Sequence, residues 1–235
     1  MPEAEAVSRM FGRIAKRYDL SNHLLSWGID FWWRRTLVEK VKRTQPGIVV
    51  DLATGSGDVA FALERKLGVQ TEVQGLDFCQ PMLDEAERKR LNRKPVPGVH
   101  FGWADILDLP LASDSVDAVT VAFGIRNLEN RSRGLGEILR ILRPGGNLFI
   151  LEFSQPYRWF CPFYYTYLKY VLPILAGWIT GRPDAYNYLG GTIMKFPPRE
   201  GLVLEMREAG FRDVLALPMT LGIVSIHQGK KVAGE

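Results

Sequence analysis

The sequence is poor in the features that would indicate a disulfide scaffold, a metal site or a nucleic-acid interface. Its 235 residues include only two cysteines, Cys79 and Cys161, which are too few and too far apart for a disulfide framework or a cluster of thiolate ligands. The net charge is only +4, and the lysines and arginines are scattered without a basic block. We therefore expect no metal, no nucleic-acid partner and a reducing, cytoplasmic location.

Long apolar runs are also missing. The first residues are acidic and contain no apolar core, so a secretory signal is not expected. The longest apolar stretch, residues 157–179, is interrupted by Pro162, Lys169 and Pro173 and barely reaches the roughly 20 residues that a membrane-spanning helix needs. Because this stretch is rich in Tyr, Phe and Trp, two interpretations stay open: a helical insertion packed over a sheet, or a segment lying at a lipid surface.

What the sequence does contain is an alternation of apolar runs of strand length with amphipathic stretches, beginning at Ile48. This pattern is typical of a mainly parallel sheet with helices on both faces. A turn is predicted at 144–146, and the last two strands are expected to complete a seven-stranded sheet with an antiparallel edge. The predicted strands are 48–52, 72–77, 99–103, 116–123, 147–153, 214–217 and 223–226. The predicted helices are 58–67, 80–91, one centred on 135–142, and 198–209.

Two further regions lie outside this alternation. Residues 1–46 are predicted to form an N-terminal helical cover, with one helix indicated by the spacing of Val7 to Ile14 and a second over 31–44. Residues 47–235 are predicted to form the main α/β domain, with a helical insertion at 157–195 before the last strands.

The first predicted strand runs into a loop of small residues, Asp51-Leu-Ala-Thr-Gly-Ser-Gly-Asp58. Gly55 and Gly57 allow a tight turn and the close approach of a ligand to the backbone. Asp58 can cap the helix that follows. A strand, a glycine turn and a helix in this order are typical of the entrance to a nucleotide-type site.

Two acidic residues in this loop indicate which nucleotide is bound. Ala60 stands where the third glycine of a dinucleotide fingerprint would be, which a looser pattern permits. However, Asp51 ends the strand and Asp58 opens the helix, where its charge would repel a pyrophosphate. S-adenosylmethionine carries a sulfonium and an amino group and no phosphate, so it fits this loop better than a dinucleotide does.

Further candidate ligand contacts follow the next two strands. Asp77 ends the second strand, where a carboxylate can bind both ribose hydroxyls, and Asp105 could accept a hydrogen bond from the adenine amino group. Phe78 and Ile106 could enclose the adenine ring, and Cys79 is expected to form part of the wall. Ligands of open α/β sheets bind at the carboxyl ends of the strands, so these residues are expected to lie together.

Several motifs give the chain a family resemblance that covers roughly Val7 to Lys230. The chain resembles class I S-adenosylmethionine-dependent methyltransferases and, more narrowly, the ubiquinone/menaquinone biosynthesis C-methyltransferases. The most specific stretches are Phe123-Gly-Ile-Arg-Asn127 and Tyr18-Asp19 with Asn22. The others are Met10–Ala15, Trp33-Arg34, the loop 51–58, Leu142–Gly146, Leu151–Ser154, and Gly222–Val224 with His227 and Gly229.

The resemblance implies a Rossmann-like class I methyltransferase fold and S-adenosyl-L-methionine as cofactor. It places cofactor contacts at Ser56, at Asp77, at Asp105 with Ile106, and at Ala122, where many members of the family have serine. It also implies methyl transfer to the ring carbon of a prenylated quinol, in menaquinone or ubiquinone biosynthesis. The aromatic segment and the Trp-rich N-terminal pair would then form an apolar entrance facing the bilayer. Peripheral contact with the membrane surface and a homodimer both stay open.

Carbon methylation requires a ring carbon made nucleophilic by ionisation of a quinol hydroxyl. Arg126 is the first candidate for this chemistry; because a guanidinium is a poor base, it would stabilise the phenolate or position a water. Asn127 could orient the substrate oxygen or Arg126 itself. Tyr18 could close over the methionine portion or hydrogen-bond to the quinol. The competing structural interpretation is that Arg126 forms a salt bridge with Asp19 or Glu129.

Three alternative functions remain at this point. The acceptor could be another lipophilic or small aromatic molecule. The chain could be a nicotinamide-dependent oxidoreductase, although Asp58 and the absence of a catalytic Tyr-x-x-x-Lys pair disfavour this class. It could also be a non-enzymatic, membrane-associated partner in a quinone-synthesising assembly.

Overall fold

The computed structural model describes residues 26–93, 98–174, 177 and 183–233. The helix predicted over Val7 to Ile14, and with it Tyr18, lies outside the described residues. The other predicted strands and helices fall within the described residues, and the predicted insertion 157–195 does so in part.

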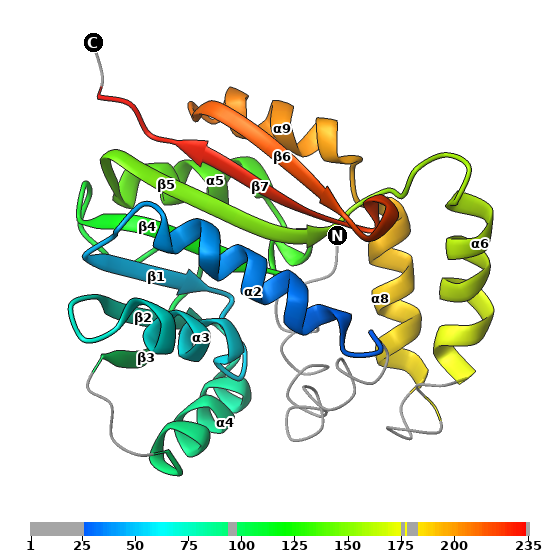
Figure 1. The fold of residues 1–235 in the computed structure, drawn as a ribbon, viewed down its shortest axis with the longest axis horizontal. Coiled ribbons are helices and arrows are strands. Elements are labelled where there is room, and N and C mark those ends of the chain that lie inside the picture. The colour runs from blue at the N-terminus through cyan, green and yellow to red at the C-terminus, as the bar shows by residue number, and fades with distance from the viewer. Residues whose placement is uncertain (1–25, 94–97, 175–176, 178–182, 234–235) are drawn as a thin grey trace.

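A seven-stranded sheet forms the centre of the molecule, with the strand order β3-β2-β1-β4-β5-β7-β6. The five strands from β3 to β5 pair in parallel, whereas β7 is antiparallel to both β5 and β6. The predicted doubly wound sheet with an antiparallel edge is therefore confirmed (Figure 1). The strands are β1 Ile48–Leu52, β2 Glu72–Asp77, β3 Val99–Trp103, β4 Val116–Ala122, β5 Leu142–Phe153, β6 Arg212–Met219 and β7 Val224–Lys230.

The largest difference from the predicted strand bounds is at the start of β5. β5 begins at Leu142, so the turn predicted at 144–146 lies inside the strand. Gly145 takes a φ of 87°, and the register against β4 shifts between Val116 and Ala118. Backbone hydrogen bonds from Gly145 N to Lys231 O and from Lys231 N to Gly146 O hold the distorted segment in place. The glycines thus form an irregularity within a strand rather than a reversal of the chain.

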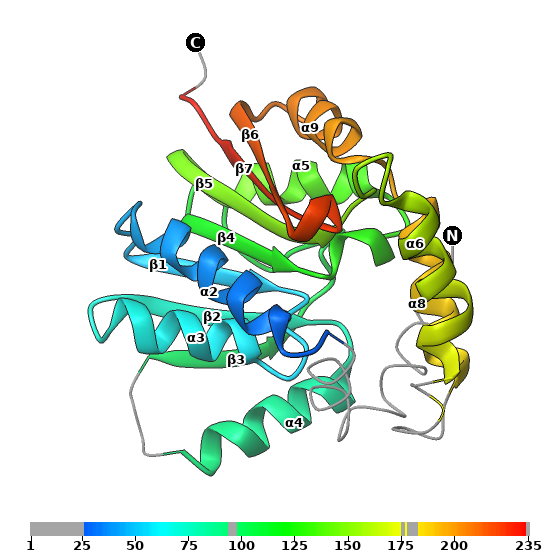
Figure 2. The ribbon, with the colours of Figure 1, turned by 45° about the vertical axis from the view of Figure 1, so that its right-hand side comes forward.

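Helices cover both faces of the sheet. On one face lie α2 Ile29–Lys42 and α3 Asp58–Leu67, and on the other lie α5 Arg131–Ile141 and α9 Arg199–Glu208. α4 Gln80–Leu91 joins β2 to β3 (Figures 1 and 2). Trp33, Leu37 and Val41 of α2 are buried in the same apolar cluster as Val49 and Phe149 of the sheet. α2 is therefore part of the helical layer on this face of the sheet. Because its apolar side is packed in the core, the side chains on the rest of the helix have fixed positions relative to the sheet.

The helical insertion follows β5. It contains α6 Cys161–Thr166, the π-helix η2 Tyr167–Val171 and α8 Pro183–Lys195. Its apolar residues Tyr164, Leu168, Leu172 and Ile193 form a small cluster of their own. Figures 1 and 2 show α6 and α8 beyond the carboxyl ends of the parallel strands. In the described part of the chain, no helix is both long and apolar enough to span a bilayer.

Candidate active site

A cleft opens at the carboxyl ends of the parallel strands, with about 1190 Å³ of empty space that is partly open to solvent. The loops after β1, β2, β3 and β4 form most of its wall. Of the residues predicted to bind the cofactor, the cleft is lined by Asp51, Gly55, Ser56, Asp77, Phe78, Asp105, Ile106 and Ala122. Gly57 is absent from the wall that the described residues form. The topology therefore brings together residues from four separate segments, as the order of the strands predicted.

Asp51 lies at the base of the cleft and is almost completely buried. Its two carboxylate oxygens accept hydrogen bonds from Thr54 Oγ1 at 2.7 Å and from Thr120 Oγ1 at 2.6 Å. Burial raises the pKa of this carboxyl to about 6, although the two hydroxyl groups oppose that rise. Asp51 thus links the glycine loop to β4, and it carries a carboxyl that titrates close to neutral pH.

The two glycines of the loop have different surroundings. Gly55 has a φ of 57° and borders the cleft. Gly57 has a φ of 86°, and a Cβ atom there would lie 2.8 Å from the Phe101 ring and 2.9 Å from the Phe61 ring. A Cβ at Gly75 on β2 would likewise lie 2.6 Å from Phe101. Gly57 is therefore required for packing of the loop on these rings.

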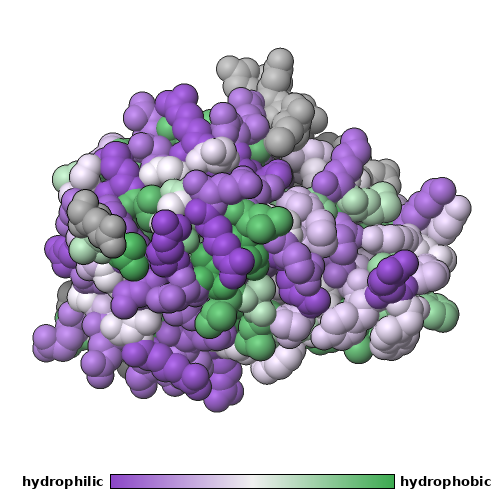
Figure 3. Space-filling view, turned by 90° about the horizontal axis from the view of Figure 1, so that it is seen from above, coloured by the Kyte–Doolittle hydropathy of each residue, from purple (hydrophilic) through white to green (hydrophobic). Residues whose placement is uncertain are grey.

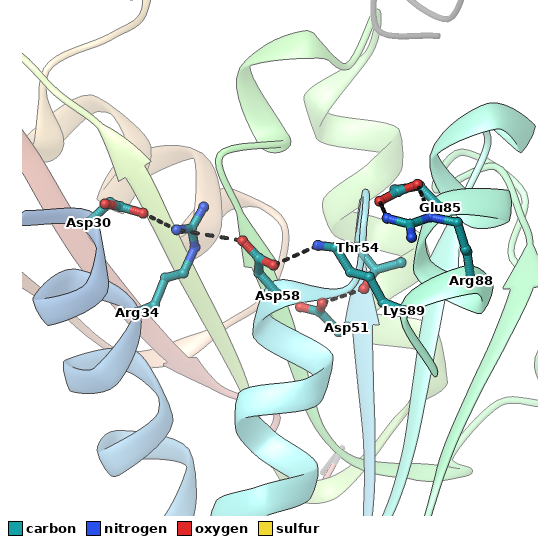
Figure 4. A network of polar contacts seen from close by, with 8 residues as sticks. All are labelled: Asp30, Arg34, Asp51, Thr54, Asp58, Glu85, Arg88 and Lys89. Carbon is teal, nitrogen blue, oxygen red and sulfur yellow. Dashed lines mark hydrogen bonds and ion pairs between the residues drawn. The ribbon is translucent and has the colours of Figure 1, made fainter. Parts of the chain in front are cut away.

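Asp58 does not cap α3, because Gly57 is the N-cap residue and Asp58 is the first residue of the helix. Its carboxylate lies 3.0 Å from Lys89 Nζ on α4 and 3.9 Å from Arg34 Nη1 on α2. Figure 4 shows Asp58 between these two cations. Since its charge is balanced, Asp58 alone is a weaker argument against a phosphate than the sequence indicated.

Asp77 connects the loop after β1 with the start of α4. Its carboxylate accepts hydrogen bonds from Gly55 N and Cys79 N, each at 2.8 Å. Burial raises the pKa of the Asp77 carboxyl, while the backbone N–H groups act in the opposite direction. Beyond it, Asp105 accepts a hydrogen bond from Leu107 N at 2.9 Å, which holds the loop carrying Ile106.

Arg126 belongs to a short 3-10 turn, η1 Ile125–Asn127, that follows β4. Its Nη1 donates to Glu152 Oε1 at 2.7 Å and to Phe123 O, and its backbone N donates to Glu152 Oε2 at 3.3 Å. Both side chains are buried, at 2% exposed for Arg126 and 0% for Glu152. Of the two partners suggested by the sequence, Asp19 is outside the described residues and Glu129 is on the cleft wall; the observed partner is Glu152.

Asn127 lies beside Arg126 and borders the cleft. Its Oδ1 accepts a hydrogen bond of 3.2 Å from the hydroxyl of Tyr188 on α8. The helical insertion therefore contacts the turn that carries two of the three candidate catalytic residues, Arg126 and Asn127. Asn127 keeps a donor group, Nδ2, that can serve a ligand in the cleft.

Sequence reasoning did not assign roles to Glu152 or Tyr188. A signal for Glu152 exists, because it is a single acidic residue within the apolar run 148–153. A charged residue in a buried strand requires a partner. No comparable signal identifies Tyr188, which is one of several tyrosines in the insertion.

The cleft suits S-adenosylmethionine chemically. Its charged wall residues, within the described ranges, are five carboxylates (Asp51, Asp58, Asp77, Asp105 and Glu129) and the single cation Arg34. Phe78, Met82 and Ile106 provide an apolar portion next to Asp77 and Asp105. Carboxylates suit the ribose hydroxyls, the amino group and the sulfonium, and the apolar portion suits the adenine ring.

Solved structures share the fold. A S-adenosylmethionine-dependent methyltransferase from Aquifex aeolicus superposes with a TM-score of 0.60, at 19% sequence identity, over 83% of this chain and 89% of that one. The sheet order, the flanking helices and the cleft at the strand ends define the fold as that of the class I S-adenosylmethionine-dependent methyltransferases.

The sequence comparisons identify the family. Residues 2–231 match the ubiE/COQ5 methyltransferase family, and the chain belongs to it. The demethylmenaquinone methyltransferase of Thermus thermophilus is 45% identical over 94% of this chain and 100% of its own length. The ubiquinone/menaquinone biosynthesis C-methyltransferase of Geotalea daltonii is 37% identical over 97% of both chains.

The raised pKa of Asp51 predicts how stability depends on pH. Because the pKa is about 6 in the folded protein and 3.8 ordinarily, the folded state holds the proton more tightly than the unfolded state. The free energy of unfolding should therefore fall as the pH rises from about 4 to 6, by about 3 kcal/mol from Asp51 alone. We expect Asp51→Asn to reduce this fall and to stabilise the ligand-free protein at pH 7.

Urea unfolding at a series of pH values would measure this effect. Asp77 and Glu152 also have raised pKa values. In Asp51→Asn the decrease in the free energy of unfolding with rising pH should therefore become smaller without vanishing. Asp84→Asn, a change at an exposed site on α4, is the control and should leave the profile unaltered. If the free energy of unfolding of Asp51→Asn depends on pH as it does in the wild type, the raised pKa of Asp51 is contradicted.

Proposed function

We propose that this enzyme transfers the methyl group of S-adenosylmethionine to a ring carbon of a prenylated quinol, with a demethylmenaquinol as the favoured acceptor. The observation that carries this proposal is the match, over nearly the whole of both chains, to relatives named for that reaction. Three residues of the motif Phe123–Asn127 line the cleft, namely Phe123, Gly124 and Asn127.

We propose that Asp77 binds the ribose hydroxyls and that Phe78 and Ile106 enclose the adenine near Asp105. Gly55, Ser56, Asp51 and Ala122 would then surround the methionine portion, since they line the part of the cleft at the ends of β1 and β4. When bound, the cofactor supplies a methyl group activated by the positive sulfur. The protein's contribution is to hold the acceptor ring in line with that group.

The acceptor must be ionised for its ring carbon to attack. The new bond joins the ring carbon to the methyl carbon. The bond between the sulfur and the methyl carbon breaks, and S-adenosylhomocysteine leaves. The proton on the methylated ring carbon then passes to water, and the electron pair of the broken C–H bond restores the aromatic ring. We propose that the Asn127 amide, which borders the cleft, donates to the phenolate oxygen that precedes the transfer. The Arg126 guanidinium, which is 2% exposed and paired with Glu152, would stabilise the same negative charge electrostatically.

Glu152 and Tyr188 support this arrangement from outside the cleft. Glu152 bonds both the side chain and the backbone of Arg126, so it fixes the turn as well as the guanidinium. Tyr188 bonds Asn127 Oδ1, which leaves Nδ2 as the end of the amide that can donate to the acceptor. Tyr18, which lies outside the described residues, remains a further candidate in this proposal.

We also propose that the helical insertion contacts the membrane surface. Trp159, Phe163, Tyr170 and Ile174 are each between 57% and 67% exposed, and Lys169 lies among them. Exposed aromatic side chains next to a cation are typical of an interfacial segment. In Figure 3 the surface at the α6 end is paler than the strongly hydrophilic surface at the opposite end.

The proposed acceptor can be tested with purified protein. We expect methylation of demethylmenaquinol, in the presence of reductant and S-adenosylmethionine, to be faster than methylation of a small phenol without a prenyl tail. Mass spectrometry of the extracted quinone would detect the added methyl group. Equal turnover of unrelated phenols, with none of the quinol, would favour the alternative acceptor class.

The role of Arg126 needs a variant that keeps the core intact. Replacing Arg126 alone would leave Glu152 buried without its cation, which costs ~3–5 kcal/mol of stability. We therefore expect the double variant Arg126→Met with Glu152→Gln to fold, to bind S-adenosylmethionine normally, and to lose about 100-fold or more in kcat.

Calorimetric titration and a stopped-time methylation assay would separate these two effects. The matched control is Arg131→Met with Glu205→Gln, which removes an ion pair of 2.7 Å that lies away from the cleft. Near-normal turnover of the Arg126 double variant would exclude Arg126 from the chemistry.

If the insertion contacts the membrane, removing its exposed aromatic rings should weaken binding to vesicles. The double variant Trp159→Ser with Phe163→Ser should weaken co-sedimentation with vesicles containing anionic lipid by more than about tenfold. The reason is that removing each aromatic ring from water contributes ~1.5–3 kcal/mol to the free energy of binding. The control, Leu204→Ser with Leu215→Ser, changes side chains of comparable exposure on α9 and β6. Unchanged vesicle binding in the aromatic variant would contradict the proposed contact.

A further inference from the structure

Arg34 is a cleft residue without an assigned role. It lies on α2, its side chain is 13% exposed, and it borders the cleft beside the glycine loop. Every other charged residue of the described cleft wall is a carboxylate. A cofactor that carries one carboxylate together with two positive groups would therefore find one cationic partner on this wall.

The guanidinium of Arg34 is held in place from one side. Asp30, one helical turn earlier, pairs with Arg34 Nη1 and is itself 4% exposed. The hydroxyl of Ser26 donates to Asp30 Oδ1 at 2.6 Å. The neighbouring residue Trp33 is buried in the core and donates from Nε1 to Thr220 Oγ1 at 2.8 Å, so this part of α2 is anchored. The position of the guanidinium is thus set before any ligand binds.

The same guanidinium nitrogen, Nη1, also faces the cleft loop. Asp58 Oδ2 lies 3.9 Å from Arg34 Nη1, and the Phe123 ring centre lies 5.9 Å from Arg34 Cζ. Figure 4 shows the guanidinium between Asp30 and Asp58. Arg34 and Asp58, which also pairs with Lys89, therefore place a guanidinium donor and a carboxylate acceptor next to the loop. These are the two kinds of partner that the carboxylate and the amino group of an amino acid require.

We propose that Arg34 binds the α-carboxylate of the methionine portion of S-adenosylmethionine. A guanidinium has five N–H donors in a planar fork, so it can retain its bond to Asp30 and still donate to a second carboxylate. Lys would not match this geometry, because its ammonium is a point charge. The inference rests on S-adenosylmethionine as methyl donor, which is one half of the proposed function, and is independent of the quinol acceptor.

Decarboxylated S-adenosylmethionine isolates this interaction, because it lacks only the carboxylate. Titration calorimetry of both compounds should show that Arg34→Met weakens S-adenosylmethionine binding ~10- to 100-fold, the range expected for hydrogen bonds to a charged group. Binding of the decarboxylated compound should be unchanged or tighter. Arg34→Lys should show an intermediate loss. Arg35→Met, at the exposed neighbouring arginine of α2, is the control and should resemble the wild type.

The double variant Asp30→Asn with Arg34→Met guards against misfolding. It removes the buried charge of Asp30 that Arg34→Met alone would leave unpaired, so we expect it to keep the fold. It should show the same selective loss. Equal weakening of both compounds, or no weakening of either, in this variant would overturn the role of Arg34. Failure of the quinol assay with a normal calorimetric result would instead count against the proposed acceptor alone.

Discussion

A buried carboxylate on β1 organises the cofactor cleft. Asp51 is the penultimate residue of β1, which lies between β2 and β4, and its two oxygens accept hydrogen bonds from one hydroxyl of the glycine loop and one of β4. Removing a carboxylate from water is costly unless its hydrogen bonds are satisfied. The loop must therefore close in the one conformation that brings Thr54 to Asp51, and that conformation brings Gly55 N to Asp77.

The strands and most of the cleft could be predicted from the sequence because both depend on short-range patterns. Apolar runs mark the strands, and acidic residues after successive parallel strands must meet at one edge of the sheet. The turn expected at 144–146 was wrong for a long-range reason: Lys231, 86 residues away (231 − 145), pairs with that segment and keeps it in the sheet. The capping role expected for Asp58 failed because Gly57 takes the N-cap position, while Lys89 and Arg34 neutralise its charge.

The supporting residues of the η1 turn show where pattern-based reasoning ends. The motif 123–127 could be recognised, but the partner of Arg126 depends on the pairing of β4 with β5, which places Glu152 beneath the turn. The contact between Tyr188 and Asn127 depends on how the insertion folds back over the strand ends. Both are tertiary contacts between residues at least 26 positions apart in the chain, and neither has a local sequence signal that specifies its partner.

The packing of Phe101 restricts which sequences this cleft can tolerate. The same ring occupies the space that a side chain would need at Gly57 and at Gly75. Alanine at position 75 would require a smaller residue at position 101 and a shift of Thr54 Oγ1, which would lie 2.9 Å from the added Cβ. At position 57 the positive φ would remain an obstacle even with a smaller residue at 101. Substitutions at 75 and 101 are therefore expected to be epistatic, so a reconstructed ancestor or a designed variant would need to change the two positions together.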